Sequence, residues 1–418
     1  MNPVPQASDK SLVLHNAQIV LPDRVLSGGG IEIEAGQIAR ILNSSDAVPT
    51  SNSSINLHGA TLLPGFVDMH IHGALGVDVN SADANGLLRV SEFLGTKGVA
   101  AWLPTLVPGP PEQYEQAIAA ISELMNQQQL LEGRLQWGVA NAKKGSTEAG
   151  TLNTCARVLG VHYEGPFVNS EQCGALHLEH FRTFRTGADL DSLPMIESEN
   201  AVHMMTLAPE IDGGIELIRE LRSRGVVVSI GHTRATPDIL DQAKQAGAQH
   251  MTHFMNAMSP LHHRAPGPVG WGLLNDDIGL DMIADGVHLD PMMLKVLLRC
   301  ATPARLALIS DAIAATGLGD GEHEIWGEKI SVQDGRTRNA RGSIAGSVIS
   351  MLDAVKMMLS LGASETDVAR MASMNPARFL GIDHECGSIE EGKRADLVAV
   401  NDRGDIQLTI RDGAVARP

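Results

Sequence analysis

Short apolar runs alternate with helix-like stretches between residues 65 and 382. Six of the runs have the length and the Val, Ile, Leu, Ala and Met content of buried strands: Val99–Pro104, Leu159–His162, Ala201–Ala208, Val226–Gly231, Ile278–Ala284 and Leu306–Ser310. Four stretches have helical character: Glu112–Gln127, Ile211–Arg224, Pro237–Ala246 and Ser350–Leu361. Strands that alternate with helices indicate a parallel sheet, and so many units suit a (β/α)8 TIM-like barrel, an α/β fold of about 250 residues or more.

The two ends of the chain have a different, purely β-like texture. Residues 11–63 contain short apolar runs broken by Gly28-Gly29-Gly30, then Ile31–Glu34, which alternates apolar and polar positions as a half-buried strand does. Strand-like runs return after residue 387. We therefore predict one small β-sandwich domain made by residues 1–62 and 383–418, and a barrel domain over residues 63–382. Residues 1–10 are expected to be a loose tail, and residues 44–54 a loop.

Composition limits the partners of the protein. The 418 residues carry a formal charge of −17, which argues against nucleic acid or an anionic membrane as a partner. Only 3% of the residues are aromatic, so aliphatic side chains must fill the core. The cysteines at 155, 173, 300 and 386 lie far apart and are expected to be free thiols in a reducing compartment. Without a secretory signal or an apolar run of about 18 residues, we expect a cytoplasmic protein.

A His-x-His pair ends the first strand of the predicted barrel. Phe66, Val67, Met69 and Ile71 are apolar, and Gly73 breaks the run. Residues two apart on a strand share a face, so His70 and His72 point the same way. Neutral imidazole is a common ligand of zinc and related divalent ions. The pair alone is more often structural than metal-binding.

Polar residues also follow the other apolar runs. In a parallel barrel these positions meet at the carboxyl-terminal mouth, where active sites are built. Glu164, His232 and His253 suffice for one ion with an open position, and the His-x-His pair offers a second ion site with Glu164 as a bridge. Asp311 is placed to take a proton from water and return it to a departing amine. Each residue alone is more often structural, but together they favour a metal-dependent hydrolase.

A second polar cluster resembles a phosphate site. The guanidinium of Arg264 can form two hydrogen bonds to a phosphate, and backbone N–H groups near Asn256 can donate further hydrogen bonds. An ordinary surface loop with one arginine is the alternative. His288 follows another strand and can contact a substrate.

Several stretches of the chain resemble the amidohydrolase superfamily and, within it, the family of N-acetylglucosamine-6-phosphate deacetylases. They are Pro64–Gly73, Glu164–Asn169, Gly231–Thr233, Thr252–Met258, Ala284–His288 and Ser310–Ala312. The resemblance implies hydrolysis of N-acetylglucosamine 6-phosphate to glucosamine 6-phosphate and acetate by a homodimer. It implies a divalent metal, zinc first and Fe²⁺ as an alternative, with one or two ions per subunit.

The same resemblance assigns roles to individual residues. Glu164, His232 and His253 match the main metal ligands, and Asp311 matches the catalytic acid/base. The residues matched to sugar-phosphate contacts are Asn256, Ala257, Arg264, His288 and His177. Three alternatives stay open: the galactosamine epimer as substrate, a cyclic-amide hydrolase and a non-catalytic scaffold. Glu164 argues against the cyclic-amide hydrolase, because those enzymes commonly have a carboxylated lysine at this position.

Overall fold

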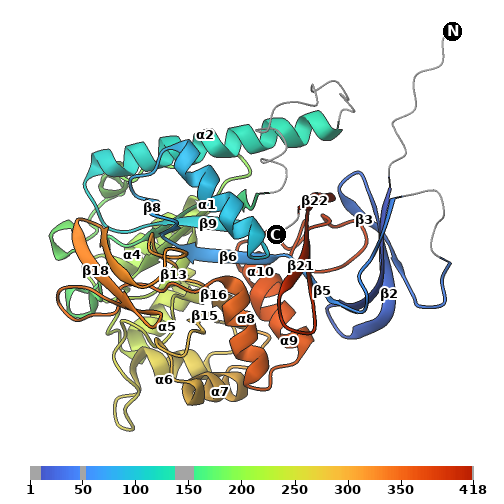
Figure 1. Ribbon diagram of the computed structural model, residues 1–418. Helices are drawn as coiled ribbons and strands as arrows, with labels where there is room; N and C mark the ends of the chain where they lie inside the picture. The colour runs from blue at the N-terminus through green and yellow to red at the C-terminus, as the bar shows by residue number, and fades with distance from the viewer. Residues whose placement is uncertain (1–10, 48–52, 137–154, 417–418) are drawn as a thin grey trace.

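The computed structural model describes residues 11–47, 53–136 and 155–416. Eight parallel strands form a barrel, and helices surround it (Figure 1). In barrel order the strands are β6 (Phe66–Ile71), β9 (Val99–Leu106), β11 (Gly160–Glu164), β12 (Val202–Leu207), β13 (Val227–Ile230), β14 (His250–Met251), β15 (Gly279–Ile283) and β16 (Leu306–Ile309). The predicted α/β barrel is therefore confirmed. The predicted tail at residues 1–10 lies outside the described residues, as does part of the predicted loop at 44–54.

The seam between β16 and β6 closes just beyond the ends of these strands. The backbone N–H of Asp311 donates to the carbonyl of His70 at 3.0 Å, and that of His72 donates to Ala312 at 2.8 Å. Beneath them, the Asp68 carboxylate accepts the Ser310 hydroxyl at 2.5 Å and the Ser310 N–H at 3.2 Å. The loop that carries Asp311 is thereby fixed to the His-x-His strand.

Seven barrel strands are each followed by an α-helix: α1 (Ala84–Thr96), α2 (Pro111–Gln136), α4 (Gly214–Ser223), α5 (Pro237–Ala246), α6 (Gly267–Leu274), α7 (Pro291–Cys300) and α8 (Met351–Ser360). Strand β11 is followed instead by three short 3-10 helices: η1 (Ser170–Gln172), η2 (Leu178–His180) and η3 (Gly187–Leu190). Helix α8 begins where predicted because Ser350 and Asp353 form a capping box. Helix α5 matches its predicted bounds, with Pro237 at its first turn and Gly247 in a left-handed cap.

The remaining helical segment runs beside the barrel through α9 (Glu365–Ala369), the π-helix η4 (Arg370–Met374) and α10 (Asn375–Phe379). Two short strand pieces, β7 (Gly73–Ala74) and β8 (Val77–Asp78), pair after β6, and β10 (Arg157–Val158) pairs with β9. The buried core is mainly aliphatic, as composition predicted. In the described ranges, no helix combines the length and apolar character needed to cross a membrane.

Both ends of the chain meet in one small sheet at the side of the barrel (Figure 1). Its strands are β1 (Leu12–Val20), β2 (Val25–Glu34), β3 (Gln37–Leu42), β4 (Ser53–Asn56), β5 (Thr61–Pro64), β20 (Leu397–Val400), β21 (Ile406–Arg411) and β22 (Ala414–Ala416). The sheet has its own apolar core. The backbone N–H of Ile38 in β3 donates to the Lys393 carbonyl at 2.9 Å, which connects β3 to the segment before β20. We propose domain limits at residues 62/63 and 382/383.

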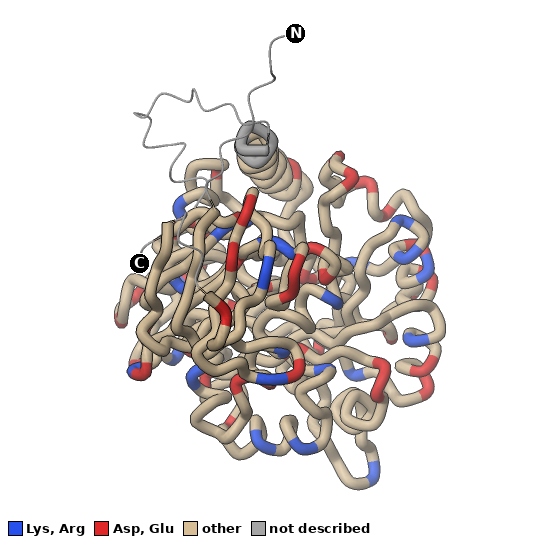
Figure 2. The backbone as a smooth tube through the Cα atoms, turned by 90° about the vertical axis from the view of Figure 1, so that its right-hand side faces the viewer, with Lys and Arg blue, Asp and Glu red and all other residues tan. Residues whose placement is uncertain are grey.

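The three consecutive glycines, Gly28–Gly30, lie inside β2. A Cβ on Gly30 would lie 2.6 Å from the Leu14 carbonyl oxygen, and one on Gly29 would lie 2.9 Å from that of Leu42. Glycine is therefore needed here for the close approach of neighbouring backbones. Seen from the side of this sheet, acidic and basic segments are interspersed along the backbone (Figure 2).

Arg411 joins the small sheet to the barrel domain. Its buried guanidinium donates to the carbonyls of Gly95 and Val99 in the barrel domain and to Leu397 and Ile410 in the sheet, at 2.7–3.4 Å. Burial lowers the pKa of Arg411 to about 10, although the Asp396 carboxylate opposes this shift. The group stays charged near neutral pH because every nitrogen has an acceptor.

We expect Arg411→Met to lower the free energy of unfolding by about 3 kcal/mol or more, because buried carbonyls and Asp396 lose their cationic partner. Urea denaturation followed by circular dichroism measures this effect. Arg403→Met is the matched control, since Arg403 is exposed in the turn before β21. Equal stability of the two variants would contradict a structural role for Arg411.

Candidate active site

Six buried polar side chains meet at the carboxyl-terminal mouth of the barrel. They are His70 and His72 from the end of β6, Glu164 from the end of β11, and His232, His253 and Asp311 from just after β13, β14 and β16. Each is at most 6% exposed. The strands are parallel, so residues scattered along the sequence reach one rim.

Glu164, His232 and His253 form the first group of possible ligands. Oε1 of Glu164 lies 2.9 Å from Nε2 of His232 and 2.9 Å from Nε2 of His253. The two Nε2 atoms are 3.2 Å apart. Three donor atoms thus converge on one point with a side open to the cavity.

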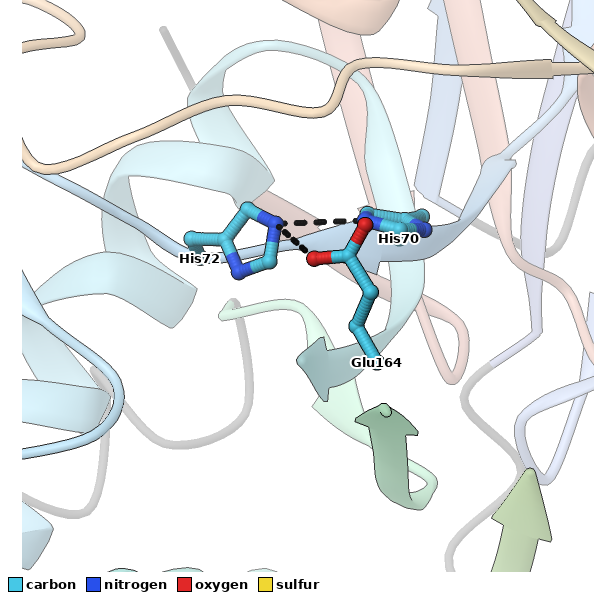
Figure 3. Close-up of side chains that lie close together, drawn as sticks. All are labelled: His70, His72 and Glu164. Carbon is cyan, nitrogen blue, oxygen red and sulfur yellow. Dashed lines mark hydrogen bonds and ion pairs between the residues drawn. The ribbon is translucent and has the colours of Figure 1, made fainter. Parts of the chain in front are cut away.

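His70, His72 and Glu164 form the second group (Figure 3). The Nε2 atoms of the two histidines are 3.1 Å apart. Oε1 of Glu164 lies 3.7 Å from Nε2 of His70, and Oε2 lies 3.4 Å from Nε2 of His72. Glu164 therefore belongs to both groups, as a bridging ligand would.

The hydrogen bonds around the rings fit a bound cation. Nδ1 of His232 lies 2.7 Å from the Gln172 carbonyl, and Nδ1 of His72 lies 3.2 Å from the Thr105 carbonyl. A carbonyl only accepts, so Nδ1 of each ring carries a hydrogen, and Nε2 is the ring atom directed toward the Glu164 oxygens. Nε2 atoms and carboxylate oxygens that lie this close together could hold one metal ion. Nitrogen and carboxylate donors suit zinc and related divalent ions.

The pKa values of Glu164 and His253 are shifted in opposite directions by their contact with each other. Burial alone would raise the pKa of Glu164, but the electrostatic interaction with His70 and hydrogen bonds with His232 and His253 hold it well below its usual value. Burial would lower the pKa of His253, but its hydrogen bond to Glu164 raises it to about 9. The site therefore favours the ionised form of Glu164.

Asp311 lies beside the His-x-His pair. Its Oδ1 is 3.4 Å from Nε2 of His70 and 3.2 Å from Nε2 of His72. The Ser347 N–H donates to the Asp311 carbonyl at 2.7 Å, which holds the loop from its other side. A carboxylate fixed at this position can exchange protons with groups at the centre of the site.

Backbone strain is concentrated at the same residues. His232, His253 and Asp311 have φ values of 47°, 32° and 50°, in the left-handed region that residues with a Cβ seldom adopt. Such conformations cost of order 1–3 kcal/mol each and persist where the surrounding structure enforces them. The fold therefore places these three side chains at a cost in stability.

A cavity of about 320 Å³ opens over the two groups. Asn256, Ala257 and His288 line it, together with Glu164 and Asp311. The Nδ2 atom of Asn256 is buried and has no partner among the described atoms, so it is available to a ligand.

The orientation of His288 in the cavity lining is fixed by Asp285. Its Nδ1 lies 2.7 Å from Oδ2 of Asp285, whose Oδ1 accepts the N–H groups of Val287 and His288 at 2.8 Å. The Asp285 side chain therefore fixes the imidazole and leaves Nε2 for a ligand.

Two predicted substrate residues lie outside the cavity lining. Arg264 is exposed in the loop before α6, and its guanidinium lies 2.7 Å from Nε2 of His263. His177 lies next to the lining residues Gly174–Leu176, and its nearest acidic atoms belong to Glu179 at 3.4 Å and Glu328 at 3.8 Å. Within one chain, neither side chain contacts the metal groups.

Several supporting residues were missed at the sequence level. Glu210 accepts from Asn169 Nδ2 at 2.8 Å, from the Thr233 hydroxyl at 2.6 Å and from the Arg234 N–H at 2.6 Å, which ties together the loops around His232. Glu210 follows the apolar run Ala201–Ala208 by two residues. The rule that polar residues just after the strands lie at the barrel mouth, which identified the candidate ligands, therefore also applies to Glu210. Asp281, inside β15, accepts the backbone N–H of His253.

Known proteins resemble this chain over nearly its whole length. The amidohydrolase family matches residues 61–416. An N-acetylglucosamine-6-phosphate deacetylase of Bacillus subtilis (strain 168) is 34% identical over 408 residues, which covers 97% of both chains. An N-acetylgalactosamine-6-phosphate deacetylase of Escherichia coli O157:H7 is 34% identical over 406 residues, covering 97% of this chain and 99% of the relative. The crystal structure of N-acetylglucosamine-6-phosphate deacetylase from Pasteurella multocida superposes with a TM-score of 0.84 at 28% identity, covering 98% of this chain and 100% of that chain.

Proposed function

The chain belongs to the amidohydrolase family, a metal-dependent family, and from that premise we propose that it hydrolyses the acetamide group of N-acetyl-D-glucosamine 6-phosphate. The products are D-glucosamine 6-phosphate and acetate, in amino-sugar metabolism. One observation carries the proposal: Glu164 lies between the imidazole pairs His232/His253 and His70/His72 in the lining of a cavity. Oδ1 of Asp311 lies 3.2–3.4 Å from the Nε2 atoms of the second pair.

Glu164, His232 and His253 would hold the main ion, and His70 and His72 with Glu164 a second. We propose zinc, with Fe²⁺ as the alternative, and one or two ions per chain. A bound divalent ion supplies polarisation of the acetamide carbonyl and acidification of water.

Asp311 moves the proton. Its carboxylate accepts a proton from the attacking water as the new C–O bond forms, and donates it to the amine nitrogen as the C–N bond breaks. Proximity to His70 and His72 keeps the carboxylate at the centre of the site, and its fixed backbone keeps it oriented. The reaction consumes one water and leaves Asp311 unchanged.

Asn256, Ala257 and His288 would contact the sugar phosphate from the ends of β14 and β15. The support is their position in the cavity lining, the unpartnered Asn256 amide and the orientation of His288 by Asp285. We retain Arg264 and His177 as proposed substrate residues on the resemblance, although both lie outside the lining of this chain's cavity.

Release of acetate and of free amine tests the function directly. We expect rapid turnover of N-acetylglucosamine 6-phosphate and little turnover of unphosphorylated N-acetylglucosamine. Equal kcat/KM for the two would contradict a phosphate site, and no release from either by metal-replete protein would contradict deacetylation.

N-acetylgalactosamine 6-phosphate is the second candidate substrate. The Escherichia coli O157:H7 relative favours it, because its identity and coverage nearly equal those of the Bacillus subtilis relative. The ratio of kcat/KM for the two epimers decides between them.

For Arg264→Ala we expect KM for the phosphorylated substrate to rise by about tenfold or more, because a charge-assisted contact is lost. Steady-state kinetics with and without the phosphate group measure this. Arg299→Ala is the control, since Arg299 is an exposed arginine in α7. An unchanged KM would remove Arg264 from substrate capture.

We also propose that the protein is a cytoplasmic homodimer with neither nucleic acid nor membrane as a partner. The charge of −17 supports the absence of polyanionic partners, and the free thiols of Cys173, Cys300 and Cys386 support a reducing compartment. Light scattering coupled to gel filtration tests the dimer.

A further inference from the structure

The antiparallel hairpin of β17 (Gly321–Ile325) and β18 (Glu328–Gln333) carries a tryptophan at its tip. With β19 (Arg336–Arg338) it forms a three-stranded sheet that lies on the side of the barrel away from the small sheet (Figure 1). Ile325 pairs with Glu328, so Trp326 and Gly327 are the two turn residues, with φ of 54° and 74°. Such turns favour Asn, Asp or Gly at the first position. A bulky aromatic residue there is strained, which suggests a functional reason for it.

Trp326 lies against the metal-site histidines. Its ring makes an edge-to-face contact with His72, with centroids 5.3 Å apart and planes at 89°. It also packs against two apolar clusters: one against which Ala175 packs as well, and one that contains Leu176. The carbon atoms of Trp326, Ala175 and Leu176 line the cavity, and we call this part of its lining the tryptophan wall. The buried Nε1 of Trp326 has no hydrogen-bond partner among the described atoms.

Polar contacts fix the hairpin to the rim of the cavity. The Thr337 hydroxyl donates to the Gly346 carbonyl at 2.6 Å and accepts the Ala345 N–H at 3.2 Å. Nδ2 of Asn339 donates to the Glu328 carboxylate at 3.3 Å. The tryptophan is therefore held on a supported element and not on a free loop.

The reacting amide has two substituents that need different surroundings. Its carbonyl carbon must lie near Asp311 and Glu164, and the sugar on its nitrogen extends to Asn256 and His288, after β14 and β15. The acyl methyl projects from the opposite side of the carbonyl carbon and needs an apolar surface. The tryptophan wall offers such a surface beside the second ligand group, because Trp326 contacts His72.

Resting on the proposed deacetylation, we propose that Trp326 limits the size of the acyl group that the site accepts. A full indole against His72 leaves room for a methyl group and excludes longer chains. One methylene in a closed apolar pocket changes kcat/KM by about 10- to 200-fold. The wild type should therefore discriminate strongly against propionyl and butyryl substrates.

The experiment compares N-acetyl-, N-propionyl- and N-butyrylglucosamine 6-phosphate as substrates of the metal-replete wild type, Trp326→Ala and Trp326→Phe. The readout is the ratio of kcat/KM for butyryl to that for acetyl, which is independent of the fraction of active enzyme. We expect Trp326→Ala to raise this ratio at least about tenfold, and Trp326→Phe to raise it less.

Ile344→Ala is the matched control, because Ile344 lines the same cavity from the loop after the hairpin and is 38% exposed. A ratio unchanged in Trp326→Ala, or raised equally by Ile344→Ala, would overturn the assignment while leaving deacetylation intact. A wild type that hydrolyses none of the three substrates would overturn the proposed function and this inference with it.

Discussion

Replacing Asp311 by Asn should leave the fold and the bound metal intact and lower kcat by about two or more orders of magnitude. Asparagine keeps the size of the side chain but cannot take up a proton, and positioned acid/base groups contribute about 10²–10⁴-fold. Activity on N-acetylglucosamine 6-phosphate, with metal content measured by elemental analysis, tests this expectation.

The backbone conformation of Asp311 makes asparagine a suitable replacement in this experiment. Its φ of 50° lies in the region that Asn tolerates well, so the substitution adds little strain. Asp334→Asn is a matched control, since Asp334 has the same φ but is exposed at the far end of the hairpin. Near-normal turnover of Asp311→Asn would remove this carboxylate from the mechanism.

Replacing Glu164 by Gln should abolish stoichiometric metal binding at both groups and lower activity by about a thousandfold or more. The carboxylate is the one side chain shared by the two groups, and the neutral amide leaves the converging imidazole lone pairs without an anionic partner. A bound ion supplies several kcal/mol of transition-state stabilisation, and each 1.36 kcal/mol is tenfold in rate. Elemental analysis and kinetics on the same preparation measure both effects.

His70→Asn is the informative companion of Glu164→Gln. It leaves Glu164, His232 and His253 in place, so we expect at least one ion per chain to remain. A wild type with two ions and a His70→Asn variant with one would establish a two-metal site. Full metal occupancy in Glu164→Gln would refute the shared-ligand arrangement.

Much of the fold followed from the sequence because buried parallel strands leave a plain pattern. Residues Ile278–Ala284 and Leu306–Ser310 are continuous apolar runs, and both are barrel strands. The positions of Glu164 and Asp311 followed from one geometric rule, that residues directly after parallel strands share a rim. Their convergence with His232 and His253 needed no knowledge of side-chain packing.

Other features depend on tertiary contacts that have no local pattern. Strand β14 has only two residues, His250 and Met251, too few for a period to be recognised. The hairpin that carries Trp326 interrupts the β/α alternation after β16, and nothing in its sequence indicates that its tip reaches His72. A helix was not predicted after β11, where η1–η3 replace it.

The hydrogen bonds of Arg411 link strand β21 to the first barrel segments, which lie far away in the sequence. Strand β5 has an unpaired edge until β20 pairs with it. The carbonyls of Gly95 and Val99 accept hydrogen bonds from Arg411, which is more than 300 positions away in the sequence. A nascent chain halted before Leu397 would expose that edge. A deletion that removes β20 or Arg411 should therefore impair solubility, although neither contributes a side chain to the candidate active site.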